Sequence, residues 1–171
     1  MHEGLLIARL VFGLLMAAHG SQKAFGWFSG YGLQGTGGFF ESIGFRPGRL
    51  FAGAAASAEI AGGLLLALGL LGPIGPALIV SVMIVAAVSV HWGSVFAASN
   101  GVEVPLLYAT VAVTLALTGP GRWSLDALLG LQRLSTPAIA IAAIVVGAIG
   151  GFANLALRRP APAKVELKEA A

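Results

Sequence analysis

The chain has 171 residues, of which 57% are hydrophobic and 10% are charged, and its net charge is +3. Soluble domains carry about 25% charged residues, so this composition and a mean hydropathy of +0.91 indicate that lipid covers much of the surface. The absence of cysteine excludes disulfides, cysteine-ligated iron–sulfur clusters and cysteine zinc sites. The basic residues are scattered or lie at segment ends, which argues against a nucleic-acid partner.

The first apolar segment, at about residues 5–25, is predicted to be a membrane helix. One face of this helix carries larger and polar side chains at steps of three or four residues, namely Arg9, Phe12, Met16, His19 and Lys23. A charged side chain near mid-membrane costs about 2.5–3.5 kcal/mol on insertion scales. Arg9 is therefore expected to face a partner inside the protein.

A polar, glycine-rich stretch, HGSQKAFGWFSGYGLQGTGGFFESIGFRP, then occupies residues 19–47. Its GYGLQG run matches the pattern GxGxxG, but it follows a membrane helix and no strand, so no dinucleotide site is predicted. The glycines favour a re-entrant or interfacial loop with tight turns, and residues 38–44 are expected to form about two helical turns. Trp27 is interpreted as an interfacial anchor, and Trp27, Gly35 and Thr36 as parts of a lid.

The other apolar segments are predicted to span the membrane at about residues 50–71, 77–96, 104–118 and 136–157. The GPIGP turn at 72–76 is expected to place the second and third spans side by side and antiparallel. Ser124 is predicted to cap a short helix that runs to Leu134. In the last span, Gly147, Gly151 and Asn154 share one face, which is typical of helix packing in lipid.

The predicted fold is an all-α membrane protein, with a four-helix transmembrane core at residues 1–134, an added transmembrane helix at 135–157 and a charged, flexible tail at 158–171. With five spans, the first loop and the tail lie on one side and carry seven Lys and Arg residues, against two on the other side. The positive-inside rule then places the first loop and the tail in the cytoplasm.

Because successive spans alternate in direction, the polar residues at the end of spans one and three and at the start of span four meet on one side of the membrane. The predicted pocket lies there under the glycine-rich loop, with Glu59 deeper and within reach of Arg9. Its candidate residues are Arg9, His19, Lys23, Glu59, His91 and Glu103.

Several interpretations of these residues remain open on the sequence alone. An Arg9–Glu59 pair fits a structural ion pair that fixes helix register, and it also fits a proton relay or an anchor for a polar ligand head. His19 and His91 fit interfacial histidines bonded to carbonyls, ligands of a metal or haem, or groups that bind a quinone carbonyl and pass its proton. No metal site is assigned, and a quinone is favoured over haem or metal as the ligand.

Four separated motifs carry a family resemblance. They are RLVFGLLMAAHGSQKAFGWFSGYGLQGTGGFFESIGFRP (9–47), AEIAGGLLLALGLL (58–71), VMIVAAVSVHW (82–92) and the segment from GVEVPLLY to GPGRWSLD (101–126). In their order and spacing they resemble the DoxX family of small bacterial membrane proteins. The family pattern falls on Arg9, His19, Gly20, Lys23, Gly26, Gly35, Thr36, Glu59, Gly62, Gly63, His91, Glu103, Gly119, Pro120, Gly121 and Asp126.

The resemblance implies a four-helix core in the bacterial cytoplasmic membrane and a link to respiratory or oxidative-stress redox chemistry, since related proteins include a subunit of a thiosulfate–quinone oxidoreductase. The favoured hypothesis is therefore a multi-pass subunit of a redox complex that binds a quinone-like amphipathic ligand. The alternatives are a carrier for a small solute or lipid, and a scaffold that anchors a soluble redox enzyme. The expected partners are the lipid bilayer, a redox enzyme and a second copy of the chain.

Overall fold

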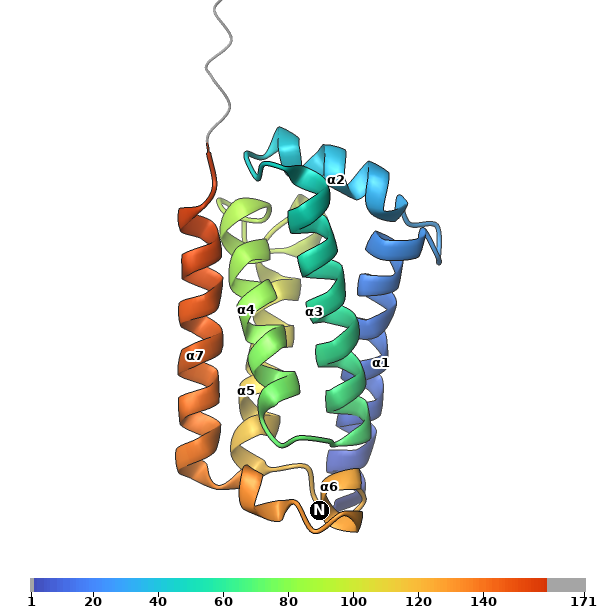
Figure 1. Ribbon diagram of the computed structural model, residues 1–171, viewed down its shortest axis with the longest axis vertical. Coiled ribbons are helices and arrows are strands. Elements are labelled where there is room, and N and C mark those ends of the chain that lie inside the picture. Colours follow the sequence, from blue (N-terminus) through green and yellow to red (C-terminus); the bar gives the residue numbers. More distant parts are fainter. Residues whose placement is uncertain (1, 160–171) are drawn as a thin grey trace, which may run out of the picture.

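A computed structural model describes residues 2–159, which form helices and connecting loops without any strand. Five long helices run side by side along the molecule, and α2 lies across one end of them (Figure 1). The elements in chain order are α1 (His2–Phe25), α2 (Gly32–Ser42), α3 (Gly48–Leu68), α4 (Ile74–Ser89), η1 (Ala97–Ser99), α5 (Glu103–Thr118), α6 (Leu125–Leu128), η2 (Gln132–Ser135) and α7 (Pro137–Ala156).

The helix lengths bear directly on how the chain crosses a bilayer. Within residues 2–159, α1, α3 and α7 are long and apolar enough to span it, with 24, 21 and 20 residues. Helices α4 and α5 are apolar but have 16 residues each, whereas about 20 residues span the hydrocarbon core. The all-helical membrane fold is therefore confirmed at this level, while five full spans stay a prediction.

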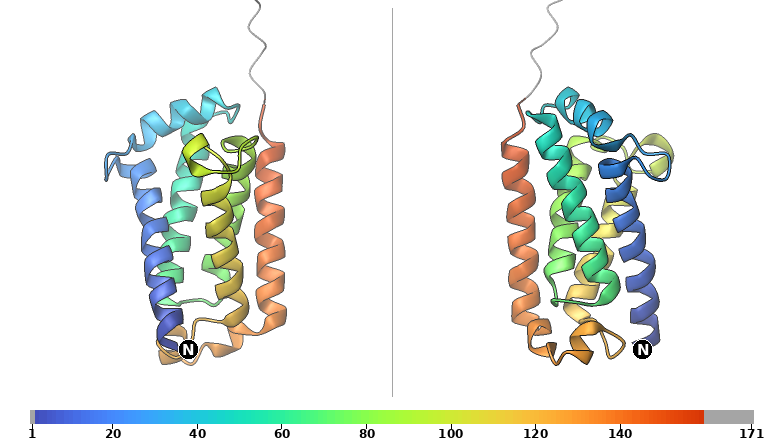
Figure 2. Two further views of the ribbon diagram at one scale, coloured as in Figure 1. Left: turned by 180° about the vertical axis from the view of Figure 1, so that it is seen from behind. Right: turned by 45° about the vertical axis from the view of Figure 1, so that its right-hand side comes forward.

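The ends of the helices alternate as the sequence predicts. The loop after α4, helix α2 and the C-terminal end of α7 lie at one end of the molecule, and the N-terminus lies at the other (Figures 1 and 2). Of the predicted tail, Arg158 and Arg159 are described, and 160–171 lie outside the described residues.

Three predicted boundaries are wrong. The short helix that Ser124 caps ends at Leu128 and not at Leu134. The glycine-rich stretch turns tightly at residues 26–32, where Gly26, Phe28, Ser29 and Gly32 have positive φ, and again at Gly44. Between these two turns it forms the 11-residue helix α2 instead of two turns. The third span ends at Ser89 and not at residue 96. Its last predicted turns form a loop instead, because serine and asparagine groups there bond to neighbouring backbone and side chains, as in the contact of 3.2 Å from the Asn100 amide to the Val90 carbonyl.

Close glycine contacts set the register between α1 and α3. A Cβ atom at Gly13 would lie 2.6 Å from the carbonyl oxygen of Gly63, and one at Gly20 would lie 2.7 Å from that of Ala56. Small residues thus allow the two backbones to touch, as in other membrane helix pairs. Glu59 lies between these contact levels on α3.

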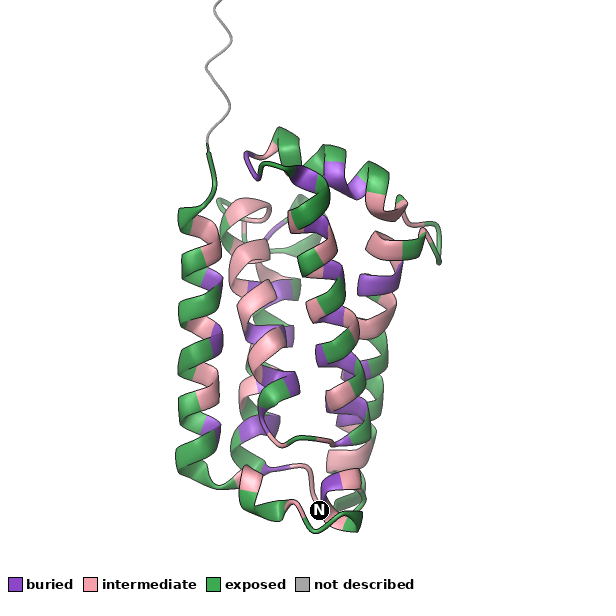
Figure 3. Cartoon of the chain, in the orientation of Figure 1, coloured by how far each residue is buried: buried purple, intermediate pink, exposed green. Residues whose placement is uncertain are grey.

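Glycines also bring α4 against α3 and α7. Gly62 and Gly75 face each other near the turn between α3 and α4, and Gly147 and Gly151 pack on the backbone of α4. Buried residues line the inner faces of the helices and exposed residues the outer faces (Figure 3). The exposed residues include many apolar side chains, such as Val146, which is 67% exposed. An apolar exterior of this kind suits contact with lipid.

Candidate functional site

A cavity of about 810 Å³ lies beneath α2, between α1, α3 and α4. Its walls are mostly apolar and include Phe40 of α2, Phe51 and Ala55 of α3, and Val82 and Val85 of α4. The glycine contacts between α3 and α4 lie near their connecting turn, whereas the cavity lies farther along both helices, where alanines of α3 leave space. Its volume falls in the range of small-molecule sites, about 300–1,000 Å³.

Helix α2 covers this cavity and is attached firmly to α3. The fully buried ring of Phe45 packs between Phe40 and Phe51, with centroid separations of 5.7 and 5.3 Å. Glu41 Oε1 accepts a hydrogen bond of 3.0 Å from the backbone N–H of Gly48 at the start of α3. Together these contacts hold the lid in place, and Gly35 and Thr36 of the lid line the cavity.

A partly buried ion pair lies in the cavity wall. Lys23 Nζ donates to Glu59 Oε1, and both residues line the cavity. Glu59 is 2% exposed, while the Lys23 side chain is 31% exposed and lies nearer the end of the bundle. Glu59 Oε2 is buried and has no hydrogen-bond partner within residues 2–159, so this carboxylate has one unsatisfied acceptor beside the cavity.

The remaining polar groups of the cavity differ in how much bonding capacity they have left. Ser89 Oγ donates to the Val85 carbonyl at 2.6 Å, and His91 Nδ1 lies 3.1 Å from the Asn100 carbonyl. Asn154 of α7 lines the cavity, and its side-chain amide makes no hydrogen bond to any part of the chain that the structure describes. Asn154 is therefore a further group that a ligand can reach.

The predicted Arg9–Glu59 pair is wrong. Arg9 is 2% exposed and lies at the opposite end of the bundle, where its guanidinium donates to the carbonyl oxygens of Pro120 and Trp123, the latter at 2.5 Å. In the α1–α3 register, Arg9 lies beyond the Gly13–Gly63 contact, on the side away from Lys23. Glu59 therefore pairs with the lysine, and Arg9 instead fixes the segment that follows α5.

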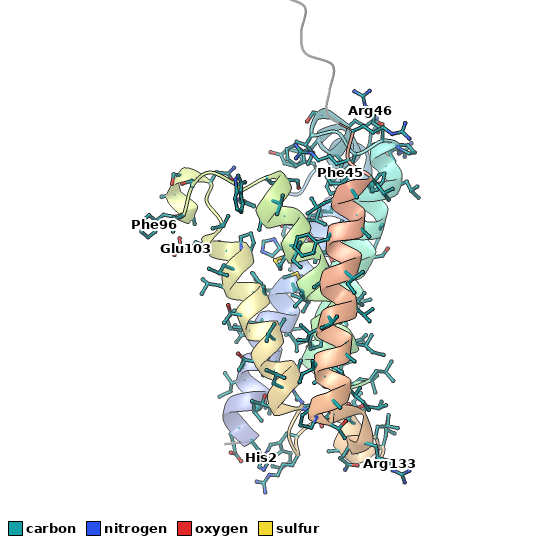
Figure 4. The ribbon with its side chains drawn as sticks, turned by 90° about the vertical axis from the view of Figure 1, so that its left-hand side faces the viewer. His2, Phe45, Arg46, Phe96, Glu103 and Arg133 are labelled. Carbon is teal, nitrogen blue, oxygen red and sulfur yellow. The ribbon has the colours of Figure 1, made fainter. Side chains whose placement is uncertain are left out.

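Three other candidate residues also lie outside the cavity wall. His19 is exposed, and its ring meets Tyr108 edge-on with centroids 6.0 Å apart. Glu103 accepts a hydrogen bond of 2.7 Å from the backbone N–H of Ala97, and it lies with Phe96 on the side of the bundle away from Phe45 (Figure 4).

Trp27 is 59% exposed beside Phe25, outside the cavity. Its position fits an interfacial anchor and not the lid. Between residues 2 and 159, no three His, Cys, Asp or Glu side chains come close enough to hold a metal ion. Of the two candidate histidines, His91 lines the cavity and His19 does not.

The sequence alone did not single out Asn154 or Ser81 as cavity residues. Asn154 was read as part of a packing face, and Gly147 and Gly151 of that face are indeed buried against α4. The sequence did contain a signal for Asn154. It lies one helical turn after Gly151 on the same face of α7, just beyond the close contact with α4, where the two helices separate and a polar side chain can face a cavity.

Comparison with known proteins identifies the first half of the chain. A family model described as DoxX matches residues 4–92, which include α2 to α4 and all of α1 except its first two residues. No curated protein and no solved structure matches the chain. The matched region supplies Lys23, Glu59 and His91 to the cavity, whereas Asn154 lies beyond it.

Proposed function

Because this chain belongs to the DoxX family of membrane proteins, we propose that it is a multi-pass subunit of a respiratory or oxidative-stress redox complex in the bacterial cytoplasmic membrane. In this proposal it binds a quinone-like amphipathic ligand in the cavity beneath α2. The observation that carries the proposal is an apolar cavity of about 810 Å³ with a partly buried ion pair in its wall and one buried, unpartnered carboxylate oxygen. Ionisable residues within a membrane bundle are rare and mark ligand or proton sites.

The wall chemistry supports a ligand with a polar ring and an apolar tail. Phe40 and Phe51 offer aromatic faces on which a ring can pack, and the ammonium group of Lys23 can donate to a ring oxygen. Glu59 can accept or return a proton close to that oxygen. Alanine, valine and phenylalanine side chains along α3 and α4 would surround the tail.

The proposed domain organisation follows from the same features. In this proposal residues 1–134 form the core that holds the ion pair, and the helix at 135–157 contributes Asn154 to the lining of the cavity. The redox role itself is supported by family membership, and the partner is a membrane or soluble redox enzyme. A carrier function would use the same cavity with α2 as its gate, and flux of a quinone analogue into proteoliposomes would favour it.

The test is to purify the full chain from native membranes, extract it and search for quinone by mass spectrometry. We expect about one quinone per chain for the wild type and a large loss for Ala55→Phe, whose ring would fill the cavity. Ala61→Phe is the matched control, because Ala61 lies on the exposed face of α3 and should leave the quinone in place. Extraction of no quinone from the wild type, together with unchanged respiration in a Glu59→Gln strain, would contradict the proposal.

A further inference from the structure

The two oxygens of the Glu59 carboxylate have different surroundings. Oε1 accepts from Lys23 Nζ, whereas Oε2 is buried at the cavity wall and has no partner within residues 2–159. A buried acceptor without a hydrogen bond is costly, and buried polar groups are almost always satisfied. A molecule that brings a hydrogen-bond donor to Oε2 therefore gains more binding free energy than one that brings a second acceptor.

The charges around this oxygen favour an uncharged ligand. The ammonium of Lys23 and the carboxylate of Glu59 compensate each other, so the pair offers no net positive charge to an anionic head group. A phosphate or carboxylate placed beside Oε2 would meet a negative charge in a poorly screened site. The apolar walls likewise make the burial of an unpaired ligand charge costly.

Lys23 has donors to spare, because an ammonium group carries three N–H bonds and Glu59 uses one of them. A hydroxyl group lying between the two side chains would accept from Lys23 and donate to Glu59 Oε2. A carbonyl or ether oxygen could only accept, and it would leave Oε2 unsatisfied.

From this geometry we propose that the cavity selects neutral amphipathic molecules that carry a hydroxyl group, such as a phenol or a quinol, over matched molecules whose oxygen only accepts. The inference rests on the proposed function, since it concerns the ligand of the same cavity, and it specifies the form that binds best. For a quinone-like ligand, the reduced, hydroxyl-bearing form is retained and the oxidised form is released more readily.

The test compares 4-heptylphenol with its methyl ether, which share the ring and the tail and differ in the hydroxyl donor. Binding to the full-length protein in lipid nanodiscs is measured by titration calorimetry or by displacement of a fluorescent probe. We expect the wild type to bind the phenol about tenfold more tightly, as one hydrogen bond to a charged group implies. Glu59→Met should reduce the preference to about twofold, and Glu103→Met, which lies outside the cavity, should retain it.

Each outcome bears on a different statement. If the wild type binds the phenol and the ether with equal affinity, and Ala55→Phe binds neither, the selection for a hydroxyl group is overturned. The cavity then remains a binding site. A phenol preference that survives in Glu59→Met overturns the role of Glu59. Binding of neither compound overturns both this inference and the proposed ligand site. The wild-type comparison needs no substitution, so it decides the main point even where Glu59→Met folds poorly.

Discussion

Replacement of Asp126 by asparagine is expected to destabilise the end of the bundle opposite the cavity. Asp126 is fully buried, and its carboxylate accepts hydrogen bonds from the backbone N–H groups of Leu71 at 2.9 Å and Gly72 at 2.7 Å. Both of these residues have positive φ, at 60° and 55°, and for Leu71 this conformation costs about 1–2 kcal/mol. The carboxylate therefore holds a strained turn between α3 and α4.

The size of the effect follows from the two bonds. A hydrogen bond to a charged group contributes about 1.5–3 kcal/mol. Asparagine keeps one acceptor oxygen for this turn but presents an NH₂ group to the second backbone N–H, so Asp126→Asn should lose about 2–3 kcal/mol. Asp126→Ala loses both acceptors and should lose about 3–5 kcal/mol.

The measurement is the free energy of unfolding in mixed micelles, with SDS as the denaturant and helical circular dichroism as the signal. Glu103→Gln provides the control, because Glu103 also accepts from a backbone N–H, that of Ala97, but on an exposed loop, and the expected loss there is below about 1 kcal/mol. If the free energy of unfolding of Asp126→Asn lies within about 0.5 kcal/mol of the wild-type value, the role assigned to this carboxylate is refuted.

Two further substitutions test the packing of the bundle and of the lid. Gly13→Val should destabilise the protein by about 2–3 kcal/mol in the same assay, because its Cβ would lie 2.6 Å from the Gly63 carbonyl oxygen. Gly4→Val is the control and should be neutral, because the space around Gly4 is open. Equal stability of the two variants would contradict the close contact between α1 and α3. Arg158→Ala removes the 2.6 Å hydrogen bond from the Arg158 Nε to the Ile43 carbonyl. Backbone hydrogen exchange at the end of α2 should therefore become severalfold faster, while the free energy of global unfolding falls by less than about 1 kcal/mol. Unchanged exchange would show that this hydrogen bond does not hold the lid.

The main helices were predictable because long apolar runs bounded by glycine and proline leave few alternatives in a membrane. The cap at Ser124 was also predictable, since its hydroxyl oxygen accepts from Ala127 at 3.2 Å as the sequence pattern indicates. The end of α4 was not. Val95 and Phe96 are apolar enough to continue a span, yet they lie in a loop and are 62% and 68% exposed. Composition does not separate lipid-facing apolar residues in a helix from those in an interfacial loop.

The ionisable residues of the site were identifiable by type, but their partners were not. Lys23 and Glu59 stood out as charges within apolar segments, and the structure brings them together at one cavity wall. Arg9 was assigned to the same pair because a carboxylate is the obvious partner for a guanidinium. Its actual acceptors are the backbone carbonyls of Pro120 and Trp123, and a backbone carbonyl carries no residue-type signal in a sequence.

One residue of the cavity lining comes from a helix that the family match does not reach. Asn154 of α7 lines the cavity, and Arg158 and Arg159 hydrogen-bond to the turn at Ile43 and Gly44 that ends the lid. A truncated chain that stops before α7 would therefore have a more open cavity, and its lid would lack the contacts with the two arginines. Affinities measured on such a fragment, or taken from a protein without an equivalent helix, would describe a cavity of different shape.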